Sequence, residues 1–419
     1  MALIALPNAP EAEIRSVRKR RTYLLTGYEP LPASAHHRRF AREIGRFEKT
    51  WSLAAHVGQP VDLPDAPVTA WPVVLSGPDF TVETDVRLLR WDDIVAEDMG
   101  LPVWKRLPRY LVVACDILLS GTFFRYALAY WRYAFFAAYP LVLLAVFAAL
   151  AWNVPALYGL FGPPLPGGLH LLAGLVLFAG LVAATGSRLH LTYMLSDWIF
   201  ARDMIRRRRS VIERRAEAFA REIAAGLAAG DVDEVVIVAH SLGAVWMLDA
   251  VGRVEAAGSP GTTPLGLAGV GSSTLKIALH PAAGWLRDRI QSVADRPTIT
   301  WAEYDSHVDF ICFYKSNTVE ALGLKAASHP IRQSVRLSRM LLPQTWKRFR
   351  GNLLRIHRQY VMGNEQRYTY DFHMIACGPF RFADIVRHGA SLPGALGPDG
   401  SLGGATTPFP ALDEDTTAR

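Results

Sequence analysis

The sequence predicts an α/β fold, in which a mostly parallel sheet flanked by helices is interrupted by an inserted two-helix transmembrane hairpin. Three observations support this prediction. Strand-like and helical segments alternate on both sides of a central apolar region, which is the order typical of α/β domains. Residues 134–187 contain no Asp, Glu, Lys or Arg. Downstream, the run EVVIVA at 234–239 has the apolar character that a parallel strand buried on both faces needs.

The part of the chain before the hairpin begins with a strand and a helix. Residues 1–21 are expected to form a basic tail, and residues 22–108 the first part of the α/β domain. A short strand at 22–26 (TYLLT) ends at a glycine, and an amphipathic helix is predicted at 36–51. The run at 82–95 predicts a second strand and its continuation. The N-terminal residues lack the order of a secretory signal, because the few apolar residues come before the basic ones.

Residues 109–200 are predicted to associate with a membrane. The segments at about 134–152 and 169–186 are apolar, and crossing a bilayer takes roughly 20 such residues. A turn rich in Pro and Gly joins them and carries no Lys or Arg, whereas basic residues flank both outer ends. The positive-inside rule therefore predicts that both soluble parts face the cytoplasm, at the inner membrane if the source is bacterial. The alternative is a pair of buried core helices, which so long a charge-free run disfavours.

The stretch at 109–133 is strongly apolar but contains Asp116 and Arg125. It therefore fits an interfacial helix or a buried support better than a third crossing. The net charge of +7 is explained if basic clusters lie beside anionic lipid, which attracts them by about 1 kcal/mol per cation. Nucleic-acid binding is not expected, because no zinc finger, RNP-type aromatic motif or helix-turn-helix signature accompanies these charges.

Residues 201–387 are predicted to complete the α/β domain. We expect a helix at 210–230, a strand at 234–239, and then a strand, a helix and a strand within 264–304. The tail at 388–419 is rich in Gly, Pro, Ala and Thr and is expected to be disordered.

Cysteine spacing indicates neither a disulfide framework nor a zinc site. The three cysteines, Cys115, Cys312 and Cys377, are widely separated and are expected to be reduced core residues. No metal or other cofactor is expected, because the sequence lacks an HExxH motif, a P-loop and clustered metal ligands.

The most informative motif surrounds Ser241, which follows the apolar strand. Ala239 and Gly243 flank it at two residues' distance, and a segment with helical spacing comes next. Small residues at these positions allow the sharp strand-to-helix turn of a nucleophile elbow, which exposes a serine hydroxyl. The alternative is an ordinary serine at a helix N-cap.

Through VVIVAHSLGA (235–244) the chain resembles the α/β-hydrolase superfamily, in particular its lipase and esterase branch. The resemblance covers about residues 23–104 and 201–382, and only the elbow is specific. The sequence has AHSLG where the usual pattern is GxSxG, a departure that keeps small residues at both ends. The resemblance implies a Ser-His-Asp triad in which the acid and then the histidine follow the serine along the chain.

Several residues could complete such a triad. For the acid we prefer Asp309, which resembles the acid-bearing loop of the family, to Asp305. For the base we prefer His357, whose HxxY arrangement resembles that of family members, to His373; His329 and His388 lie in less suitable segments. His240 is not expected to be the base, because neighbouring side chains on a tight elbow diverge.

An oxyanion hole needs two donors. We expect them from the backbone N–H of Leu242 and, in the loop TGYEP at 26–30, from that of Tyr28; the alternative for this loop is a simple β-turn.

These features predict a membrane-anchored serine hydrolase that cleaves ester bonds, those of lipids or other acyl esters, through an acyl-enzyme. Its partners would be the lipid bilayer and the acyl-ester substrate. Two alternatives stay open: a membrane acyltransferase with the same triad, and a catalytically inactive hydrolase-like scaffold.

Overall fold

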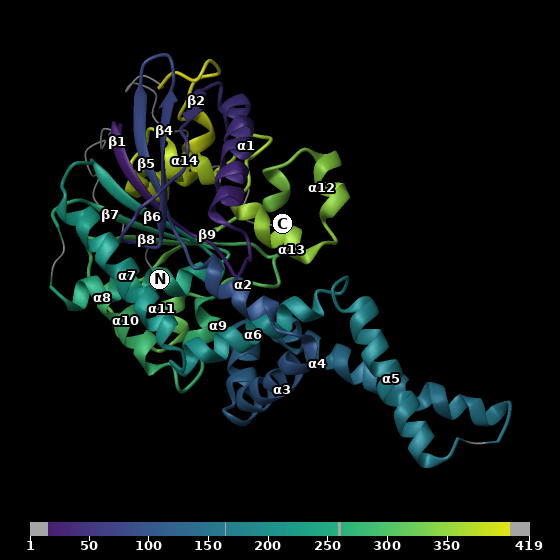
Figure 1. Cartoon of the computed structure of the whole chain (residues 1–419). Helices are drawn as coiled ribbons and strands as arrows, with labels where there is room; N and C mark the ends of the chain where they lie inside the picture. The colour runs from purple at the N-terminus through teal and green to yellow at the C-terminus, as the bar shows by residue number, and fades with distance from the viewer. Residues whose placement is uncertain (1–15, 164, 259–260, 403–419) are drawn as a thin grey trace, which may run out of the picture.

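The computed structural model describes residues 16–402 except 164 and 259–260. Its centre is a sheet with the strand order β2-β4-β5-β1-β6-β7-β8-β9, and β3 pairs with β4 at one edge (Figure 1). From β5 to β9 neighbouring strands are parallel, whereas β2, β3 and β5 are antiparallel to β4. The α/β prediction is confirmed, with a mixed sheet. The strands are β1 (Lys19–Leu25), β2 (Ala54–Val57), β3 (Val61–Asp62), β4 (Val68–Ser76), β5 (Thr81–Leu89), β6 (Glu234–His240), β7 (Leu265–Val270), β8 (Thr300–Asp305) and β9 (Ile331–Ser334).

Strands β2 to β4 had not been predicted from the sequence. Pro72 lies inside β4, and a proline within a run argues against a strand because it cannot donate to the ladder. Here the carbonyl of Pro72 still accepts a hydrogen bond from Gly58 N at 2.8 Å. The antiparallel partners around β4 therefore make up for the missing donor.

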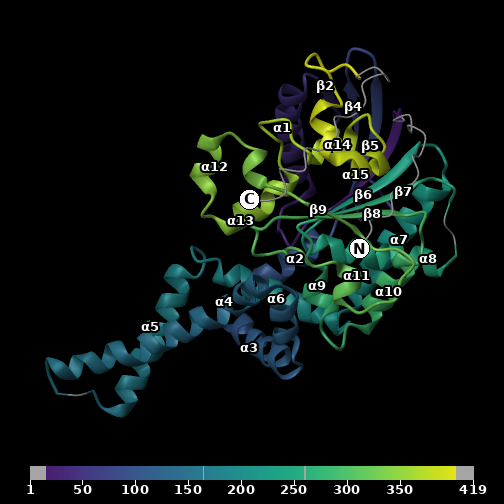
Figure 2. The ribbon, with the colours of Figure 1, turned by 180° about the vertical axis from the view of Figure 1, so that it is seen from behind.

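Helices cover both faces of the sheet (Figures 1 and 2). Side chains of β6 alternate between two core layers: Val235 and Ile237 pack with α6, α7, α8 and α10, whereas Val236 and Val238 pack with α1, α14 and α15. This alternation is what a strand with side chains on opposite faces requires. The helices of the α/β part are α1 (Ala33–Trp51), α2 (Asp92–Gly100), α7 (Ser210–Ala228), α8 (Gly243–Ala256), α9 (Thr274–Ala278), α10 (Gly284–Ala294), α11 (Thr318–Ala321), α12 (Pro343–Phe349), α13 (Leu353–Arg358), α14 (Phe372–Cys377) and α15 (Phe382–His388).

The insertion consists of α3 (Val103–Leu119), α4 (Thr122–Leu157), α5 (Gly167–Thr185) and α6 (Leu191–Ile205). Helices α4 and α5 are long and apolar enough to cross a membrane, and only 6% of the apolar window of α5 is buried. They project from the α/β body as a hairpin (Figure 1). Small residues let them approach closely, since a Cβ on Gly174 would lie 3.0 Å from the carbonyl oxygen of Ala151. Membrane association is therefore supported, although helix α4 begins at Thr122 rather than near residue 134.

Both terminal segments are more ordered than expected where the structure describes them. Val17 N donates a hydrogen bond to Pro379 O at 2.7 Å, and β1 already begins at Lys19. Leu392 and Leu396 of the predicted disordered tail are buried, because a few apolar side chains reach the core despite the Gly- and Pro-rich composition. Residues 1–15 and 403–419 lie outside the described part.

Of the cysteines expected in the core, Cys312 and Cys377 are buried but Cys115 is exposed.

The basic residue Arg20, expected in a tail, is instead a buried residue of the sheet. Its Nε donates to Glu234 Oε1 at 2.8 Å, and its remaining nitrogens donate to the carbonyls of Gly378 and Phe380. Both charged side chains are almost fully buried. The pair thereby ties β1 and β6 to the chain that leads into α15.

Replacing Arg20 with methionine is expected to lower the free energy of unfolding by about 3–5 kcal/mol, because it leaves Glu234 as a buried charge without its partner. Chemical denaturation in detergent, followed by tryptophan fluorescence, measures the loss. The matched control is Arg207→Met, which removes a partly exposed pair with Glu213 and should cost at most about 1 kcal/mol. Equal losses in the two variants would contradict the structural role of Arg20.

Candidate active site

Ser241 lies on a strained turn between β6 and α8. Its φ angle is 55°, a left-handed conformation that is uncommon for any residue other than glycine. Its N–H donates to Val270 O at 3.1 Å, and its carbonyl accepts from Ala244 N and Ser273 N, both at 3.1 Å. A residue in this conformation costs of order 1–3 kcal/mol and persists only where the surrounding structure holds it. Here the three backbone hydrogen bonds hold Ser241 in place.

The small residues of the motif have a steric reason. A Cβ on Gly243 would lie 2.4 Å from Leu25 O, because the start of α8 packs directly on the end of β1. A Cβ on Gly27, in the loop after β1, would lie 3.6 Å from Ser241 Oγ. The loop predicted to provide an oxyanion donor therefore lies beside the serine hydroxyl.

His357 and Asp309, the preferred base and acid, are in contact. His357 Nδ1 lies 2.7 Å from Asp309 Oδ2, and the other oxygen of Asp309 accepts Ile311 N at 2.9 Å. The carboxylate is an acceptor, so in the neutral imidazole Nδ1 carries the proton and Nε2 keeps its lone pair. Nε2 is buried and has no hydrogen-bond partner in the part of the chain that the structure describes. This tautomer is the one that can take a proton from a hydroxyl group.

His240 helps to position His357. Its Nε2 lies 2.9 Å from the backbone carbonyl oxygen of His357, which can only accept, so Nε2–H donates. The two imidazole rings are 4.6 Å apart. Burial, with the neighbouring His357, lowers the pKa of His240 to about 3, which keeps it neutral. The sequence excluded His240 as a base but did not predict this contact, because the two residues lie far apart in the chain.

The hydroxyl of Ser241 is hydrogen-bonded to a second serine. Its Oγ lies 3.3 Å from Ser273 Oγ, and Ser273 is buried where the chain enters α9 after β7. His357 approaches the same edge, with its Cε1 3.2 Å from the position of a Cβ on Gly271. Both residues therefore lie at the same edge of the sheet. Among the described residues no hydrogen bond joins them, because Ser241 Oγ is bonded to Ser273 and His357 Nε2 has no partner. Ser273 was missed in the sequence, although its place just after a parallel strand was a usable signal.

Replacing Ser273 with alanine is expected to raise the rate at which Ser241 reacts with a fluorophosphonate by up to about fivefold. The bond between the two hydroxyls is worth about 1 kcal/mol, and without it Ser241 turns toward His357 more easily. Labelling time courses of the parent and the variant measure the change. A fall in rate of tenfold or more would contradict this view and assign Ser273 a direct part in stabilising the reacting group.

The alternate acid and base lie elsewhere. Asp305 accepts hydrogen bonds from Arg332 Nε at 2.8 Å and Lys315 N at 3.1 Å, which fixes the ends of β8 and β9. His373 is packed against Phe40 and Phe47 of α1, and burial lowers its pKa to about 3. Its ring nitrogens have no partner among the described residues. The structure therefore brings Asp309 and His357 together and leaves both alternates out of that pair.

The two expected oxyanion donors are the backbone N–H groups of Leu242 and Tyr28. Leu242 immediately precedes α8, and N–H groups at the start of a helix have no acceptor within it. The ring of Tyr28 packs against both Trp91 and Phe200, and its backbone carbonyl accepts a hydrogen bond from Tyr193 Oη at 2.8 Å. The loop is therefore held from the side of α6.

Glu29 anchors the same loop from the other side. It forms ion pairs with Arg39 of α1 at 2.8 Å and with Arg358 of α13 at 3.1 Å. Burial alone would raise the pKa of Glu29, but the two guanidinium groups lower it to about 2. Because Arg358 follows His357, this carboxylate connects the loop beside Ser241 to the helix that carries the base.

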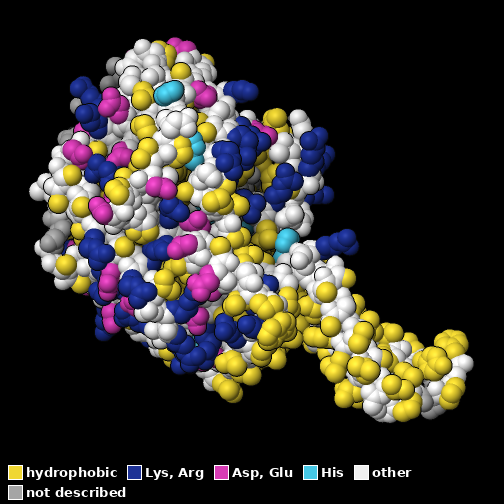
Figure 3. All heavy atoms as spheres, viewed as in Figure 1, with side chains coloured by type: hydrophobic (Ala, Val, Ile, Leu, Met, Phe, Trp, Pro, Cys, Tyr) yellow, Lys and Arg dark blue, Asp and Glu magenta, His cyan; other side chains and the backbone are white. Residues whose placement is uncertain are grey.

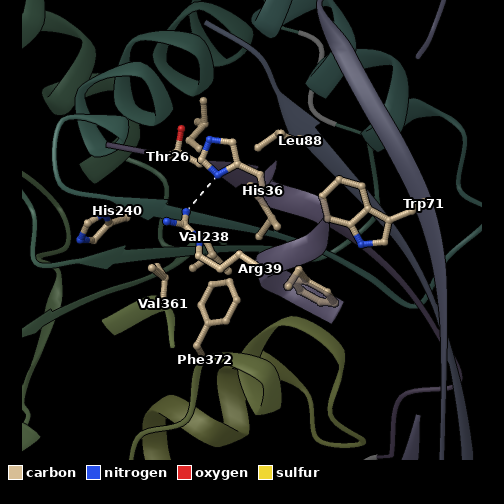
Figure 4. A pocket seen from close by; sticks show the side chains of 12 residues that line it. Thr26, His36, Arg39, Trp71, Leu88, Val238, His240, Val361 and Phe372 are labelled. Carbon is tan, nitrogen blue, oxygen red and sulfur yellow. Dashed lines mark hydrogen bonds between the residues drawn. The ribbon is translucent and has the colours of Figure 1, made fainter. Parts of the chain in front are cut away.

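A cavity of about 40 Å³ lies between α1 and the ends of β1 and β6 (Figure 4). His240, Thr26, His36 and Arg39 are among the residues that line it, and Arg39 donates to His36 Nδ1 at 2.9 Å. Burial, together with the charge of Arg39, lowers the pKa of His36 to about 4, so it is neutral and accepts this bond. A space of this size holds a water molecule and is too small for an acyl chain.

Helices of the insertion contact the loops around the candidate site. In addition to the bond from Tyr193 to Tyr28, Arg132 Nη1 donates to His307 O at 3.0 Å, and Ser316 Oγ donates to Ala129 O at 2.9 Å. The loops at 26–30 and 305–316 follow β1 and β8, whose carboxyl ends lie at the same edge of the sheet. The candidate site therefore lies where this edge meets α4 and α6.

Comparison of the chain with protein-family models, with curated proteins and with solved structures gave no match. Within the described part of the chain, no group of three or more His, Cys, Asp or Glu residues is arranged to hold a metal ion.

Proposed function

We propose that this protein is a membrane-anchored serine hydrolase of the α/β-hydrolase class, which cleaves ester bonds through Ser241, His357 and Asp309. The observation that carries the proposal is the bond from His357 to Asp309, made by residues 48 positions apart in the chain, next to a serine in a strained turn. A buried aspartate, a histidine whose Nε2 has no partner among the described residues and a serine at the same edge of the sheet are the groups from which a nucleophilic triad is built.

The geometry supports a definite sequence of steps. Ser241 Oγ turns from Ser273 toward His357 and attacks the ester carbonyl, while His357 Nε2 takes its proton. Catalytic hydrogen bonds of this kind often form only when substrate is bound. The oxygen of the tetrahedral intermediate is stabilised by Leu242 N–H and by an N–H of the loop at 26–30. His357 then returns the proton to the leaving alcohol, and water releases the acyl group by the same route.

The substrate is inferred from the place of the site. Because the loops around Ser241 contact α4 and α6, an ester in the adjoining leaflet has the shortest path to the serine. The basic residues at the outer ends of the hairpin favour the cytoplasmic leaflet. We therefore propose lipid or other long-chain acyl esters as substrates.

A fluorophosphonate probe tests the proposal, because it forms a bond only with an activated serine. The full chain in detergent should be labelled once, and peptide mapping should place the label on Ser241. p-Nitrophenyl esters of graded chain length should then be hydrolysed, and product analysis in the presence of an added alcohol separates hydrolysis from acyl transfer. The absence of labelling, or labelling confined to another residue, would refute the proposal.

A further inference from the structure

Large apolar side chains are exposed on α3 and on the start of α4, outside the hairpin. Among the described residues, the exposed large hydrophobic side chains outside 104–189 are Val61, Ile331, Leu342 and Leu353, which are scattered. On α3 and the start of α4, by contrast, they are concentrated within residues 104–128, and we call this set the apolar ledge. The apolar ledge consists of Trp104, Leu111, Val112, Leu118, Leu119, Phe124 and Leu128. Soluble surfaces rarely expose so large an apolar patch without a binding partner.

The opposite side of α3 is attached firmly to the protein. Tyr110, Val113 and Ile117 are buried in the core. Asp116 forms ion pairs with Arg202 and Arg206, and these charges explain why an acid lies in so apolar a helix. These contacts fix the orientation of α3. The side chain of Leu119, which is 88% exposed, therefore cannot be buried by rotation of the helix.

A break in α4 separates the ledge from the spanning part of the helix. Tyr130 has φ −159° and ψ 103°, which are not helical angles. The turns before Tyr130 can therefore follow a different direction from residues 131–157. The hydrophobic surface nevertheless continues from the hairpin onto the adjoining body of the protein (Figure 3), with Trp131 and Phe135 exposed just beyond the break.

The charges around the ledge agree with a lipid partner. Lys105, Arg109 and Arg125 are exposed beside it, and the only acid between residues 103 and 133 is Asp116, which is already paired. Basic residues and tryptophans at the edge of an apolar surface are typical of segments that lie in the headgroup layer. A protein partner would not explain why this surface is continuous with two helices that are long and apolar enough to span a bilayer.

We propose that the apolar ledge lies in the interface of the leaflet that the hairpin enters, so that the α/β body rests on the membrane at a fixed angle. The bonds of Ala129 and Arg132 to the loop at 305–316 then hold that loop at the level of the lipid headgroups. The docking itself does not depend on the proposed hydrolase activity. Only its consequence, direct entry of a lipid ester to Ser241, rests on that function.

Native Cys115 provides the probe for a test on the full chain. It is exposed, whereas Cys312 and Cys377 are buried, and its spacing from Leu111, Leu118 and Leu119 places it on the ledge side of α3. We would label it with the environment-sensitive fluorophore NBD and reconstitute the protein in vesicles of phosphatidylcholine and phosphatidylglycerol. The emission should shift to the blue, and lipids spin-labelled near the headgroup should quench it several-fold more strongly than lipids spin-labelled at the end of the chain.

Two control positions, each in a Cys115→Ala background, calibrate the measurement. A label at Val61→Cys, on an exposed strand of the body, should emit as in water and resist quenching. A label at Leu175→Cys, in the middle of α5, should be quenched by the deep spin label. Water-like emission at position 115 would overturn the proposal. A blue shift with no quenching by either lipid would also overturn it, because the ledge would then be covered by protein.

Discussion

Replacing Ser241 with alanine is expected to lower the rate of ester hydrolysis by about 10⁴-fold or more, the size of effect seen when the nucleophile of a triad is removed. Alanine deletes the hydroxyl but keeps the backbone of the elbow and its three hydrogen bonds. The measurement is kcat for a p-nitrophenyl ester with the full chain in detergent, together with fluorophosphonate labelling, which should disappear.

The control for this variant is Ser292→Ala, on α10, where the hydroxyl donates to the carbonyl of the preceding turn, at Asp288. It should hydrolyse and react with the probe as the parent does. Thermal unfolding of both variants should stay close to that of the parent, which separates lost chemistry from lost structure. Ester hydrolysis that persists at the parental rate without Ser241 would mean that the nucleophile lies elsewhere.

Replacing Asp309 with asparagine is expected to lower kcat by about 10⁴-fold, because the tautomer of the base is then wrong. The carboxylate accepts Nδ1–H of His357 at 2.7 Å; an amide that donates to Nδ1 forces the proton onto Nε2, and Nε2 can then no longer accept the proton of Ser241. Steady-state kinetics measure the loss. Substrate binding should change far less than kcat, because Asp309 is buried away from the substrate.

The alternate acid provides the matched control. Asp305→Asn removes a carboxylate that pairs with Arg332, so it should affect the stability of the β8 and β9 ends more than kcat. Denaturation and kinetics on both variants separate the two roles. A large loss of activity in Asp305→Asn with little change in Asp309→Asn would reverse the assignment made from the structure.

Much of the architecture could be predicted from local patterns. The strand β6, the small residues around Ser241 and the two long apolar helices each have a signal within a short window. Strand β4 lacked such a signal because Pro72 interrupts it. The chain at 388–402 was mistaken for disorder because its contacts, such as the bond of Arg367 Nη1 to Leu396 O at 2.7 Å, are made with distant residues.

The candidate site, like the fold, could be predicted from the sequence only in part. The serine could be located from the sequence because the steric needs of a tight turn act on adjacent residues. The preference for Asp309 over Asp305, and for His357 over His373, rested on the family resemblance and not on local steric needs, since each member of the triad comes from a different element. Roles for His240 and Ser273 were not predicted at all, because their partners, His357 and Ser241, belong to elements brought together only by the sheet.

By itself the sequence determined the α/β class, the strand-to-helix turn at Ser241 and the presence of two helices long and apolar enough to span a membrane. These features depend on hydrophobic period, residue size and charge within roughly 20 neighbouring positions. Only the tertiary structure decided which imidazole faces which carboxylate, and that the apolar side of α3 is left exposed beside the hairpin. The pairing of side chains depends on how parallel strands align their carboxyl ends, and the exposure of α3 depends on which face of the helix its neighbours cover. Both are determined by residues far apart in the chain.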